Sequence, residues 1–506
     1  MENHLLSILL AIPLVGAALI LFLPKDKESL IRWTGFVVTI VAFLVSLFVL
    51  YKFKPAFPLF QMIDQMLWIN TLHTYYAVGI DGISLPLVIL TTFLMPLTMI
   101  SSWKSIKKKV REFTFFMLLL EVGMIGVFIS LDMFLFYIFW EFMLIPMYFI
   151  IGIWGGEQRI YASLKFFIYT MAGSLLMLVA IIFIGFYATE KLGYFTTLVT
   201  HFYTIGPELP VTISRWLFLA FTISFAIKVP LFPFHTWLPD AHVQAPTAGS
   251  VILAGVLLKM GTYGMIRFSI PIFPESAKYF APYVSALAVI GIIYGALVAM
   301  VQKDMKKLVA YSSVAHLGFV VLGIFSFTVE GMQGAVLQMV NHGLSTGALF
   351  LLVGIVYERT HTREISEYGG IAKITPVFST LFLIVCLSSI GLPGLNGFIG
   401  EFLILLGAFQ SAVLGSWAFS IIASSGVIFA AVYLLWMYQR VVFGPVKNEK
   451  LLKLKDVTVL EFSLISIIIL LIVWIGVYPT TFLNWSDATV TNYIMKSLRQ
   501  IGGIVN

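Results

Sequence analysis

The sequence Phe-Ala-Ile-Lys-Val-Pro-Leu-Phe-Pro-Phe-His occupies residues 225–235, inside an apolar segment near the middle of the chain. Lys228 places a charge there, which costs roughly 3 kcal/mol on membrane-insertion scales. Pro230 and Pro233 donate no backbone N–H and crowd the carbonyls one turn earlier, so they interrupt the helix. Carbonyls freed at membrane depth need a protein-lined or water-filled cavity, and a charge beside such a break is typical of an ion or proton site. The alternative is a lysine that snorkels to the surface beside a packing kink.

The composition is that of a polytopic membrane protein. The chain has 506 residues, of which 60% are hydrophobic and only 11% charged, against about a quarter charged in a soluble protein. Cys386 is the only cysteine, which excludes disulfides, iron–sulfur clusters and Cys-rich zinc sites within the chain. The eight histidines form no His-x-x-x-His pair, and no glycine-rich phosphate loop follows a strand pattern. We therefore expect no metal site and no redox or nucleotide cofactor in this chain.

The apolar segments predict an all-α fold of about fourteen transmembrane helices, since one span needs about 20 apolar residues. The first segment has neither a basic region before it nor a small-residue cleavage site after it, so we interpret it as a retained span rather than a signal peptide. The seventh span is broken at its prolines, and the twelfth is over-long and also broken. The predicted spans are 4–23, 31–51, 81–102, 112–130, 132–152, 164–188, 215–236, 247–268, 281–301, 308–327, 333–357, 376–410, 417–440 and 458–478.

The net charge of +7 comes from basic residues in short loops, which indicates membrane topology rather than nucleic-acid binding. Most of the 31 Lys and Arg residues fall after odd-numbered spans, which places those loops in the cytoplasm and both termini on the outer, periplasmic side of a bacterial inner membrane. Between the second and third spans, the aromatic segment 52–80 predicts a short strand or hairpin on the outer face. The basic segment 440–457 is expected to lie at the cytoplasmic lipid surface.

Several other ionisable residues lie inside spans. Glu141 is mid-span in the fifth helix, one turn before Pro146, and Lys228 offers it a cationic partner, either for proton handling or as a structural ion pair. Glu121, in the fourth span, has no obvious partner, and helix packing explains it equally well. Asp132 lies at a helix start, where an N-cap role explains it.

Lys259 lies deep in the eighth span without a carboxylate nearby in sequence. Such a lysine can take up and release a proton, or it can cap a neighbouring helix carbonyl. His316 and His342, in the tenth and eleventh spans, suit a proton relay between Lys259 and a carboxylate, because imidazole can both donate and accept. His235, just past the first break, is a further candidate for proton transfer, and a satisfied core histidine is the alternative reading of each.

A second break echoes the first. Gly391, Pro393 and Gly394 interrupt the twelfth span, and Glu401 follows them. Because the seventh and twelfth spans are five helices apart, they cross the membrane in opposite directions. Two broken helices of opposite direction, each with an ionisable residue, are typical of inverted repeats, here spans 4–8 and 9–13.

These repeats define the expected division of the chain. Residues 1–111 hold the first three helices, 112–270 the first repeat, and 281–441 the second repeat. Residues 442–506 hold an amphipathic loop, the fourteenth helix and a tail. Asp240 and His242, which follow the seventh span, are expected in a solvated loop near the cytoplasmic surface, with a proton entrance as the alternative.

At these residues the chain resembles the antiporter-like subunits of respiratory complex I, the proton-translocating NADH:quinone oxidoreductase. The resemblance covers nearly the whole chain, and the run from Lys228 to His242 is its most specific part. The other matching motifs are Phe139-Trp140-Glu141 with Pro146, Ala310-Tyr311-Ser312-Ser313 with His316, and Gly391-Leu392-Pro393-Gly394 with Gly397 and Glu401.

The resemblance implies a Glu–Lys pair at Glu141 and Lys228, a central lysine at Lys259 and a terminal ionisable residue at Glu401. A glutamate at that last position is typical of M-type (chain 4) members, whereas L- and N-type members usually carry lysine. The implied partners are the bilayer, protons and other membrane subunits, including L-type and N-type neighbours. The implied function is proton pumping driven by quinone reduction elsewhere in the complex. Subunits of multisubunit Na+/H+ antiporters and membrane-bound hydrogenases share the family, and a purely structural membrane spacer is a further alternative.

Overall fold

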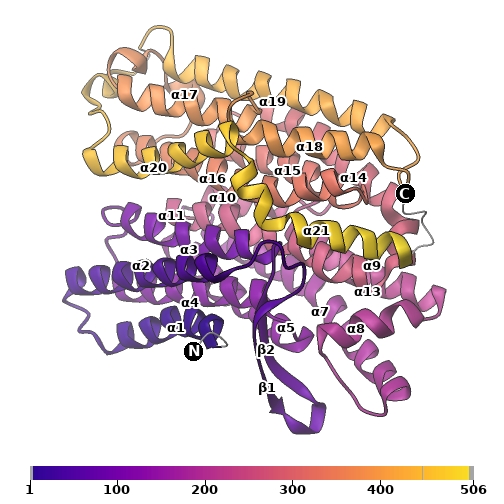
Figure 1. Cartoon of the computed structure of the whole chain (residues 1–506). Helices are drawn as coiled ribbons and strands as arrows, with labels where there is room; N and C mark the ends of the chain where they lie inside the picture. Colours follow the sequence, from indigo (N-terminus) through magenta and orange to yellow (C-terminus); the bar gives the residue numbers. More distant parts are fainter. Residues whose placement is uncertain (1–3, 447, 501–506) are drawn as a thin grey trace.

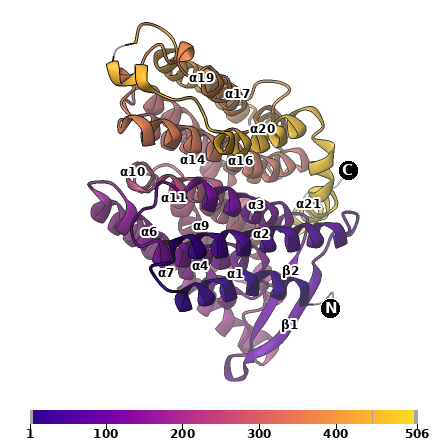
Figure 2. The ribbon, with the colours of Figure 1, turned by 90° about the vertical axis from the view of Figure 1, so that its left-hand side faces the viewer.

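Among the described residues, thirteen helices of the computed structural model are long and apolar enough to cross a membrane. Two shorter apolar helices, α17 (Pro376–Ile390) and α18 (Asn396–Gln410), follow one another where the broken twelfth span was predicted. The structure describes residues 4–446 and 448–500. Figures 1 and 2 show two stacked halves, with the N-terminal part (indigo to magenta) in one and the C-terminal part (orange to yellow) in the other. The predicted all-α polytopic fold is confirmed.

The chain begins with two spans and a β-hairpin that projects beyond the helices (Figures 1 and 2). The strands are antiparallel, with Gln61 opposite Ile80 and Ile69 opposite Thr74. The Tyr76 hydroxyl donates to Ser7 Oγ at 2.8 Å and so ties the hairpin to the first helix. The predicted hairpin is confirmed. These elements are α1 (Leu5–Phe22), α2 (Glu28–Lys52), β1 (Gln61–Ile69), β2 (Thr74–Ile80) and α3 (Ser84–Ser101).

The first half continues with long helices and several short ones. Asp132 Oδ1 accepts from the backbone N–H groups of Phe134 (2.9 Å) and Leu135 (3.1 Å), which confirms its predicted N-cap role. The helices are α4 (Val110–Ile129), α5 (Met133–Phe142), α6 (Leu144–Trp154), α7 (Arg159–Leu192), α8 (Val199–Ile205), α9 (Val211–Lys228), α10 (Trp237–Gln244), α11 (Thr247–Ile252), α12 (Leu258–Gly264) and α13 (Ile270–Ile272). Two π-helical turns, Leu253–Leu257 and Met265–Ser269, lie on either side of α12 within the eighth span.

The second half is built from longer, less interrupted helices. Asp304 caps α15 by accepting from Lys306 and Lys307, and Asp456, in the loop before α20, accepts from the first N–H groups of α17. The predicted position of segment 440–457 at the lipid surface stays a prediction. The remaining spans are α14 (Pro274–Met300), α15 (Met305–Ile324), α16 (Val329–Thr360), α19 (Ala418–Val442) and α20 (Val459–Val477).

Successive spans end alternately on two faces of the molecule. We call the face that carries β1, β2 and α8 the hairpin face. The opposite, basic face collects arginines that donate to backbone or acidic groups at the span ends. These contacts are Arg32 to the Trp103 carbonyl (2.6 Å), Arg363 to Asp304 (3.1 Å) and Arg359 to Glu461 (2.7 Å).

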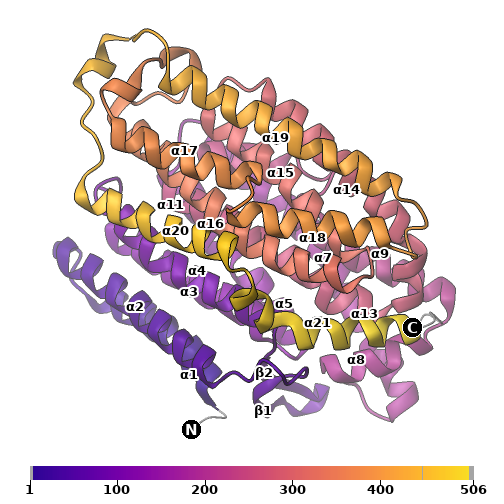
Figure 3. The ribbon, with the colours of Figure 1, turned by 45° about the horizontal axis from the view of Figure 1, so that its top comes forward.

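The segment after the last span, expected to be a tail, forms the helix α21 (Thr480–Gln500). Figures 1 and 3 show α21, in yellow, running on from α20 towards α13. Ser486, Val490, Ile494 and Ser497 are buried at helical spacing, so one side of α21 packs on the protein. Its side chains bond both halves, since Thr489 and Tyr493 contact the first half and Asp487 accepts from Gln333 of α16 at 2.5 Å. The hydropathy pattern does not predict this helix, because it is too polar to be a span.

Glycines allow the closest helix contacts around the first break. A Cβ on Gly261 of α12 would lie 2.7 Å from the Phe225 carbonyl oxygen and 3.0 Å from the Val229 nitrogen, both backbone atoms. The contact holds α9 against the helix that carries Lys259, because small residues let membrane helices approach closely.

We predict that Gly261→Ala destabilises the protein by about 1–3 kcal/mol, because backbone atoms cannot move aside for the new methyl group. The matched control is Gly347→Ala in α16, whose Cβ would meet its nearest atom at an ordinary 3.7 Å. The midpoint of thermal unfolding in detergent is the measurement. An equal midpoint for the two variants would contradict the close contact.

Candidate functional site

The first predicted break lies where α9 ends at Lys228. Residues 229–236 form turns, and the chain resumes as α10. The Ala226 carbonyl, which Pro230 cannot serve because it has no N–H, accepts from the Leu231 N–H at 2.8 Å. The predicted break is therefore present, and this freed carbonyl is satisfied inside the protein.

Lys228 is buried among aromatic rings. Its Nζ lies 5.2 Å from the ring centre of Trp140 and 5.5 Å from that of Phe166, within the range of cation–π attraction. Glu141 is its electrostatic neighbour, and Ser174 hydrogen-bonds that carboxylate. Among the described residues neither Lys228 Nζ nor Glu141 Oε1 has a hydrogen-bond partner. The structure thus brings the two predicted residues near one another without a direct bond.

A further interruption lies beside Glu141. The fifth span is split, because α5 ends at Phe142 and α6 begins at Leu144. Pro146 has no N–H to donate to the Phe142 carbonyl, which gives a physical cause for the split. Glu141 therefore occupies the last turn of a half-span, where the backbone is less constrained than in a continuous helix.

Lys259 follows the first π-helical turn and is fully buried. Its ammonium donates to the Ala254 carbonyl of that turn and lies 2.6 Å from Nδ1 of His342. The carbonyl contact matches the helix-cap alternative, and the imidazole contact matches the relay hypothesis. Because Lys259 Nζ makes both contacts, the helix-cap role and the relay role are compatible.

The relay candidates form a row from Lys259 to Glu401. The ring centres of His342 and His316 are 5.9 Å apart, and Nδ1 of His316 lies 2.7 Å from Oε1 of Glu401. Gln338 also donates to Oε1 of Glu401, at 3.0 Å. All five side chains are buried, with exposures of 4% or less. Sequence positions far apart thus converge on one buried line of proton-binding groups.

The two imidazoles share a small cavity. It measures about 10 Å³ and is lined by both histidines with Ser345, Thr346 and Ser388 among others. A volume of about 10–15 Å³ for a water-sized probe holds one water molecule. The Nε2 atoms of His316 and His342 have no hydrogen-bond partner in the described residues, so both are available to such a water.

The second predicted break lies between α17 and α18. Gly391 ends α17 with a φ of +82°, a left-handed conformation that glycine adopts without strain. Asn396 then fills the break with its side chain, whose oxygen accepts from Ser388 Oγ (2.6 Å) and the Gly397 N–H (2.9 Å). Its amide nitrogen donates to Ser345 Oγ at 3.2 Å. Asn396 thus makes this break polar and hydrogen-bonded through its side chain, whereas the first break is lined by aromatic rings.

His235 stands apart from the row. Its ring lies 5.0 Å from that of Tyr294 and 5.8 Å from that of Phe232, and its Nδ1 is without a partner in the described part of the chain. Glu121 is buried, and both its carboxylate oxygens lack a partner in that part of the chain. The structure therefore joins four of the predicted side chains, sets two as neighbours and leaves His235 separate.

Two groups near the basic face are buried although the sequence predicts them in solvated loops. Lys306, assigned to a loop, is 6% exposed and donates to the Ala245 carbonyl at 2.5 Å. His242, expected in a solvated loop, is fully buried in α10 and stacks on Phe350 at 4.6 Å. A cavity of about 570 Å³ opens beside Lys306, with Asp304, Thr362 and Arg363 among its lining residues. Hydropathy cannot reveal that Lys306 and His242 are buried, because tertiary packing buries these span ends.

The fold and the buried row define a class of membrane protein. The profile described as NADH:quinone oxidoreductase/Mrp antiporter, TM matches residues 130–430, and that of NADH-ubiquinone oxidoreductase chain 4, amino terminus, matches residues 9–127. The chain therefore belongs to the family of NADH:quinone oxidoreductase and Mrp antiporter membrane subunits. The resemblance seen in the sequence is confirmed.

One curated relative and two solved structures show how far the similarity extends along the chain. NADH-quinone oxidoreductase subunit M of Rhodobacter capsulatus is 45% identical, over 99% of this chain and 98% of its own. A chain of respiratory complex I from Thermus thermophilus with bound NADH is 32% identical with a TM-score of 0.87, over 99% of this chain and all of its own. A chain of the Mrp complex from Dietzia is 17% identical with a TM-score of 0.85, covers 99% of both chains and shows the fold alone.

We predict that Asn396→Ala lowers stability by about 1–3 kcal/mol, because Ser345 and Ser388 lose a buried hydrogen-bond partner. The assembled protein should be less abundant in membranes and dissociate at lower temperature. Asn70→Ala, in the exposed hairpin turn, is the control and should leave both quantities unchanged. Equal thermal stability of the two variants would show that the bonds at the second break are dispensable.

Proposed function

We propose that this chain is a proton-pumping membrane subunit of an NADH:quinone oxidoreductase, respiratory complex I, with no redox centre of its own. The observation that carries the proposal is the buried row from Lys259 through His342 and His316 to Glu401. A line of groups that each bind a proton, shielded from lipid, suits stepwise proton transfer. The similarity to a protein named NADH-quinone oxidoreductase subunit M supports the assignment to this complex.

The row has a consistent direction. When Lys259 carries its proton it donates to Nδ1 of His342, 2.6 Å away, and a neutral imidazole then carries its own proton on Nε2. His316 donates from Nδ1 to the Glu401 carboxylate, so its own Nε2 is free to accept. A water between the two Nε2 atoms would complete a chain in which every donor points towards Glu401. A proton released by Lys259 can then advance by successive hydrogen-bond exchange.

Proton uptake is best assigned to the basic face. The cavity beside Lys306 brings solvent to the span ends, and His242 is an electrostatic neighbour of both Lys306 and Lys259. Lys228 and Glu141 supply the control element. When Glu141 approaches, its carboxylate would stabilise the protonated form of Lys228. When Glu141 withdraws, Lys228 would give up its proton more readily.

The driving energy comes from partner subunits. One proton moved against 100 mV needs about 2.3 kcal/mol, which this chain cannot draw from a redox reaction of its own. We assign the basic face to the cytoplasm and the hairpin face to the periplasm of a bacterial inner membrane, following the distribution of Lys and Arg. L-type and N-type subunits are the proposed neighbours.

We also propose that spans 4–8 and 9–13 are inverted repeats, which sets domain boundaries at 112–270 and 281–441. The helix ends at Lys228 and at Ile390 support this division, because each interrupts the seventh or twelfth span near a proposed proton carrier. In this view Glu141 and Lys228 serve one half, Glu401 serves the other, and Lys259 lies between them.

Removing either member of the Glu141–Lys228 pair should abolish pumping and electron transfer together while the complex still assembles. Glu141→Ala and Lys228→Ala each delete the charge to which the other responds, so we expect both rates to fall at least about tenfold, in line with the loss of one acid–base group. The measurement is acidification of membrane vesicles alongside NADH oxidation, in sodium-free buffer.

Glu275→Ala and Lys25→Ala, on exposed residues, are the matched controls and should behave as wild type. Near-normal pumping and electron transfer in both pair variants would show that the pair is structural. Pumping that requires added sodium would favour an antiporter instead.

His342→Gln and His316→Gln test the row itself. Glutamine retains a hydrogen bond but cannot carry a proton, so we expect at least a tenfold loss of pumping with assembly unchanged. His4→Gln, at an exposed residue that pairs with Asp64 of β1 far from the row and from the cavity beside Lys306, is the control. If the ratio of protons pumped to electrons transferred and both rates stay at wild-type values, the protons take another route.

A further inference from the structure

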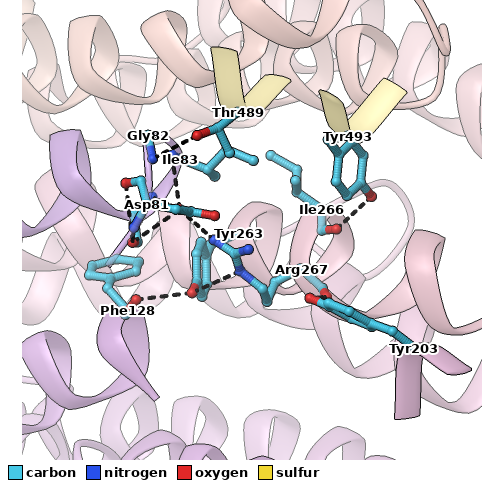
Figure 4. Close-up of polar contacts among 11 residues, drawn as sticks. Asp81, Gly82, Ile83, Phe128, Tyr203, Tyr263, Ile266, Arg267, Thr489 and Tyr493 are labelled. Carbon is cyan, nitrogen blue, oxygen red and sulfur yellow. Dashed lines mark hydrogen bonds and ion pairs between the residues drawn. The ribbon is translucent and has the colours of Figure 1, made fainter. Parts of the chain in front are cut away.

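A buried ion pair lies at the hairpin end of the eighth span (Figure 4). Arg267 Nη2 donates to Asp81 Oδ1 at 2.7 Å, and both side chains are about 4% exposed. Arg267 Nε also donates to the Tyr263 hydroxyl at 3.1 Å, which in turn donates to the Phe128 carbonyl at 2.9 Å. The guanidinium lies 4.8 Å from the ring centre of Phe60. The proton row described above uses none of these residues.

Two backbone carbonyls at Arg267 accept hydrogen bonds from tyrosine hydroxyls. Pro271 has no N–H for the Arg267 carbonyl, which accepts from the Tyr203 hydroxyl at 2.8 Å instead. The neighbouring carbonyl of Ile266 accepts from Tyr493 of α21 at 2.6 Å. The second π-helical turn is thus fixed from outside, and the guanidinium has one defined position.

Helix α21 covers this cluster. The Thr489 hydroxyl accepts from the Gly82 N–H at 3.1 Å, next to Asp81. A Cβ on Gly82 would lie 2.3 Å from the Trp485 carbonyl oxygen, so the helix packs directly on the backbone there. Figure 4 shows Thr489 and Tyr493 reaching into the cluster from α21. Water on the hairpin face is thereby kept away from the pair.

The pair lies between Lys259 and the hairpin face. Arg267 follows Lys259 by eight residues of one span, which corresponds to about 12 Å at 1.5 Å per residue. Tyr263 lies midway and is fully buried. A proton that left Lys259 along its own helix would therefore have to pass the guanidinium to reach the hairpin face.

We infer that Arg267, held by Asp81, is an electrostatic barrier that closes the hairpin end of the eighth span to protons, so that a proton on Lys259 leaves only along the His342 row. This inference rests on the proposed pumping function. An arginine cannot release its proton in a protein, so it neither relays protons nor loses its charge. Seen from Lys259, the Asp81 carboxylate largely cancels the charge of Arg267, so the barrier acts at close range. At an effective dielectric constant of about 20, a proton about 4 Å from the guanidinium and about 7 Å from the carboxylate is disfavoured by roughly tenfold.

The test is passive proton permeability of proteoliposomes that contain the purified complex, without NADH, under a potassium diffusion potential. The double variant Asp81→Asn/Arg267→Gln removes both charges and leaves no unpaired buried carboxylate. We expect its permeability to rise about tenfold or more. Asp81→Asn alone keeps the barrier charge and a hydrogen-bond acceptor, so these vesicles should remain tight.

A purely structural role for the cluster predicts a different pattern. Tyr493→Phe removes the bond from α21 but keeps Arg267, and we expect it to remain as tight as wild type. A leak in Tyr493→Phe equal to that of the double variant would overturn the barrier, as would a tight double variant. Adding Lys259→Met to the leaking double variant should restore tightness, and a leak that persists would overturn the assigned route.

Two further variants distinguish the barrier from a failure of assembly and from a failure of the pumping proposal. If the double variant does not assemble, Asp81→Asn/Arg267→His replaces it, because a buried imidazole without a carboxylate partner is neutral at pH 8 and should leak there; tight vesicles at pH 8 would overturn the inference. Failure of the pumping proposal itself appears separately, as unchanged NADH-driven pumping in the single variant Lys259→Met. The passive measurement does not depend on that turnover.

Discussion

A buried polar group inside this bundle is costly unless the protein itself supplies its partner, because lipid offers none. Lys259 depends on this constraint most directly. No carboxylate of the described residues hydrogen-bonds it, and it is held by the Ala254 carbonyl of a π-helical turn and by His342. The irregular turn is therefore part of the site, as π-helical turns in functional helices often are. From Lys259 the row continues through a hydrogen bond to His342, a ring-centre distance of 5.9 Å to His316 and a hydrogen bond from His316 to Glu401.

The two helix breaks meet the same constraint in opposite ways. At the second break Asn396 satisfies the hydroxyls around it, and the structure there is polar and bonded. At the first break Lys228 faces aromatic rings, and its ammonium has no hydrogen bond in the described part of the protein. An under-bonded charge responds strongly to its surroundings. At an effective dielectric constant of about 20, moving a carboxylate from about 8 to about 4 Å changes the pair energy by about 2 kcal/mol, comparable to one proton against 100 mV. This difference supports the proposed division, in which the first break controls proton uptake and the second lies on the conducting row.

Much of this arrangement could be predicted from the sequence, and the rest could not for physical reasons. Prolines beside Lys228 and glycines before Glu401 carry strong local signals, so both breaks and the number of spans were predictable. Arg267 and Lys306 lie at span ends, where hydropathy assigns them to water, yet α21 and α10 bury them. The π-helical turns have no compositional signature. A relay through His316 or His342 between Lys259 and Glu401 was proposed from residue chemistry, but the order of the histidines and the distances depend on how four helices pack.

The choice between lysine and arginine follows the same logic along the eighth span. Lys259, at the centre, can gain and lose a proton, and its single ammonium bonds both a carbonyl and an imidazole. Arg267, near the hairpin face, keeps its charge permanently, and its planar fork reaches Asp81 and Tyr263 at once. Both are buried cations on one helix, about two turns apart. A directed proton path requires an exchangeable charge on the path and a permanent charge where protons must not pass, and in the proposed mechanism Lys259 and Arg267 supply these two charges on one helix.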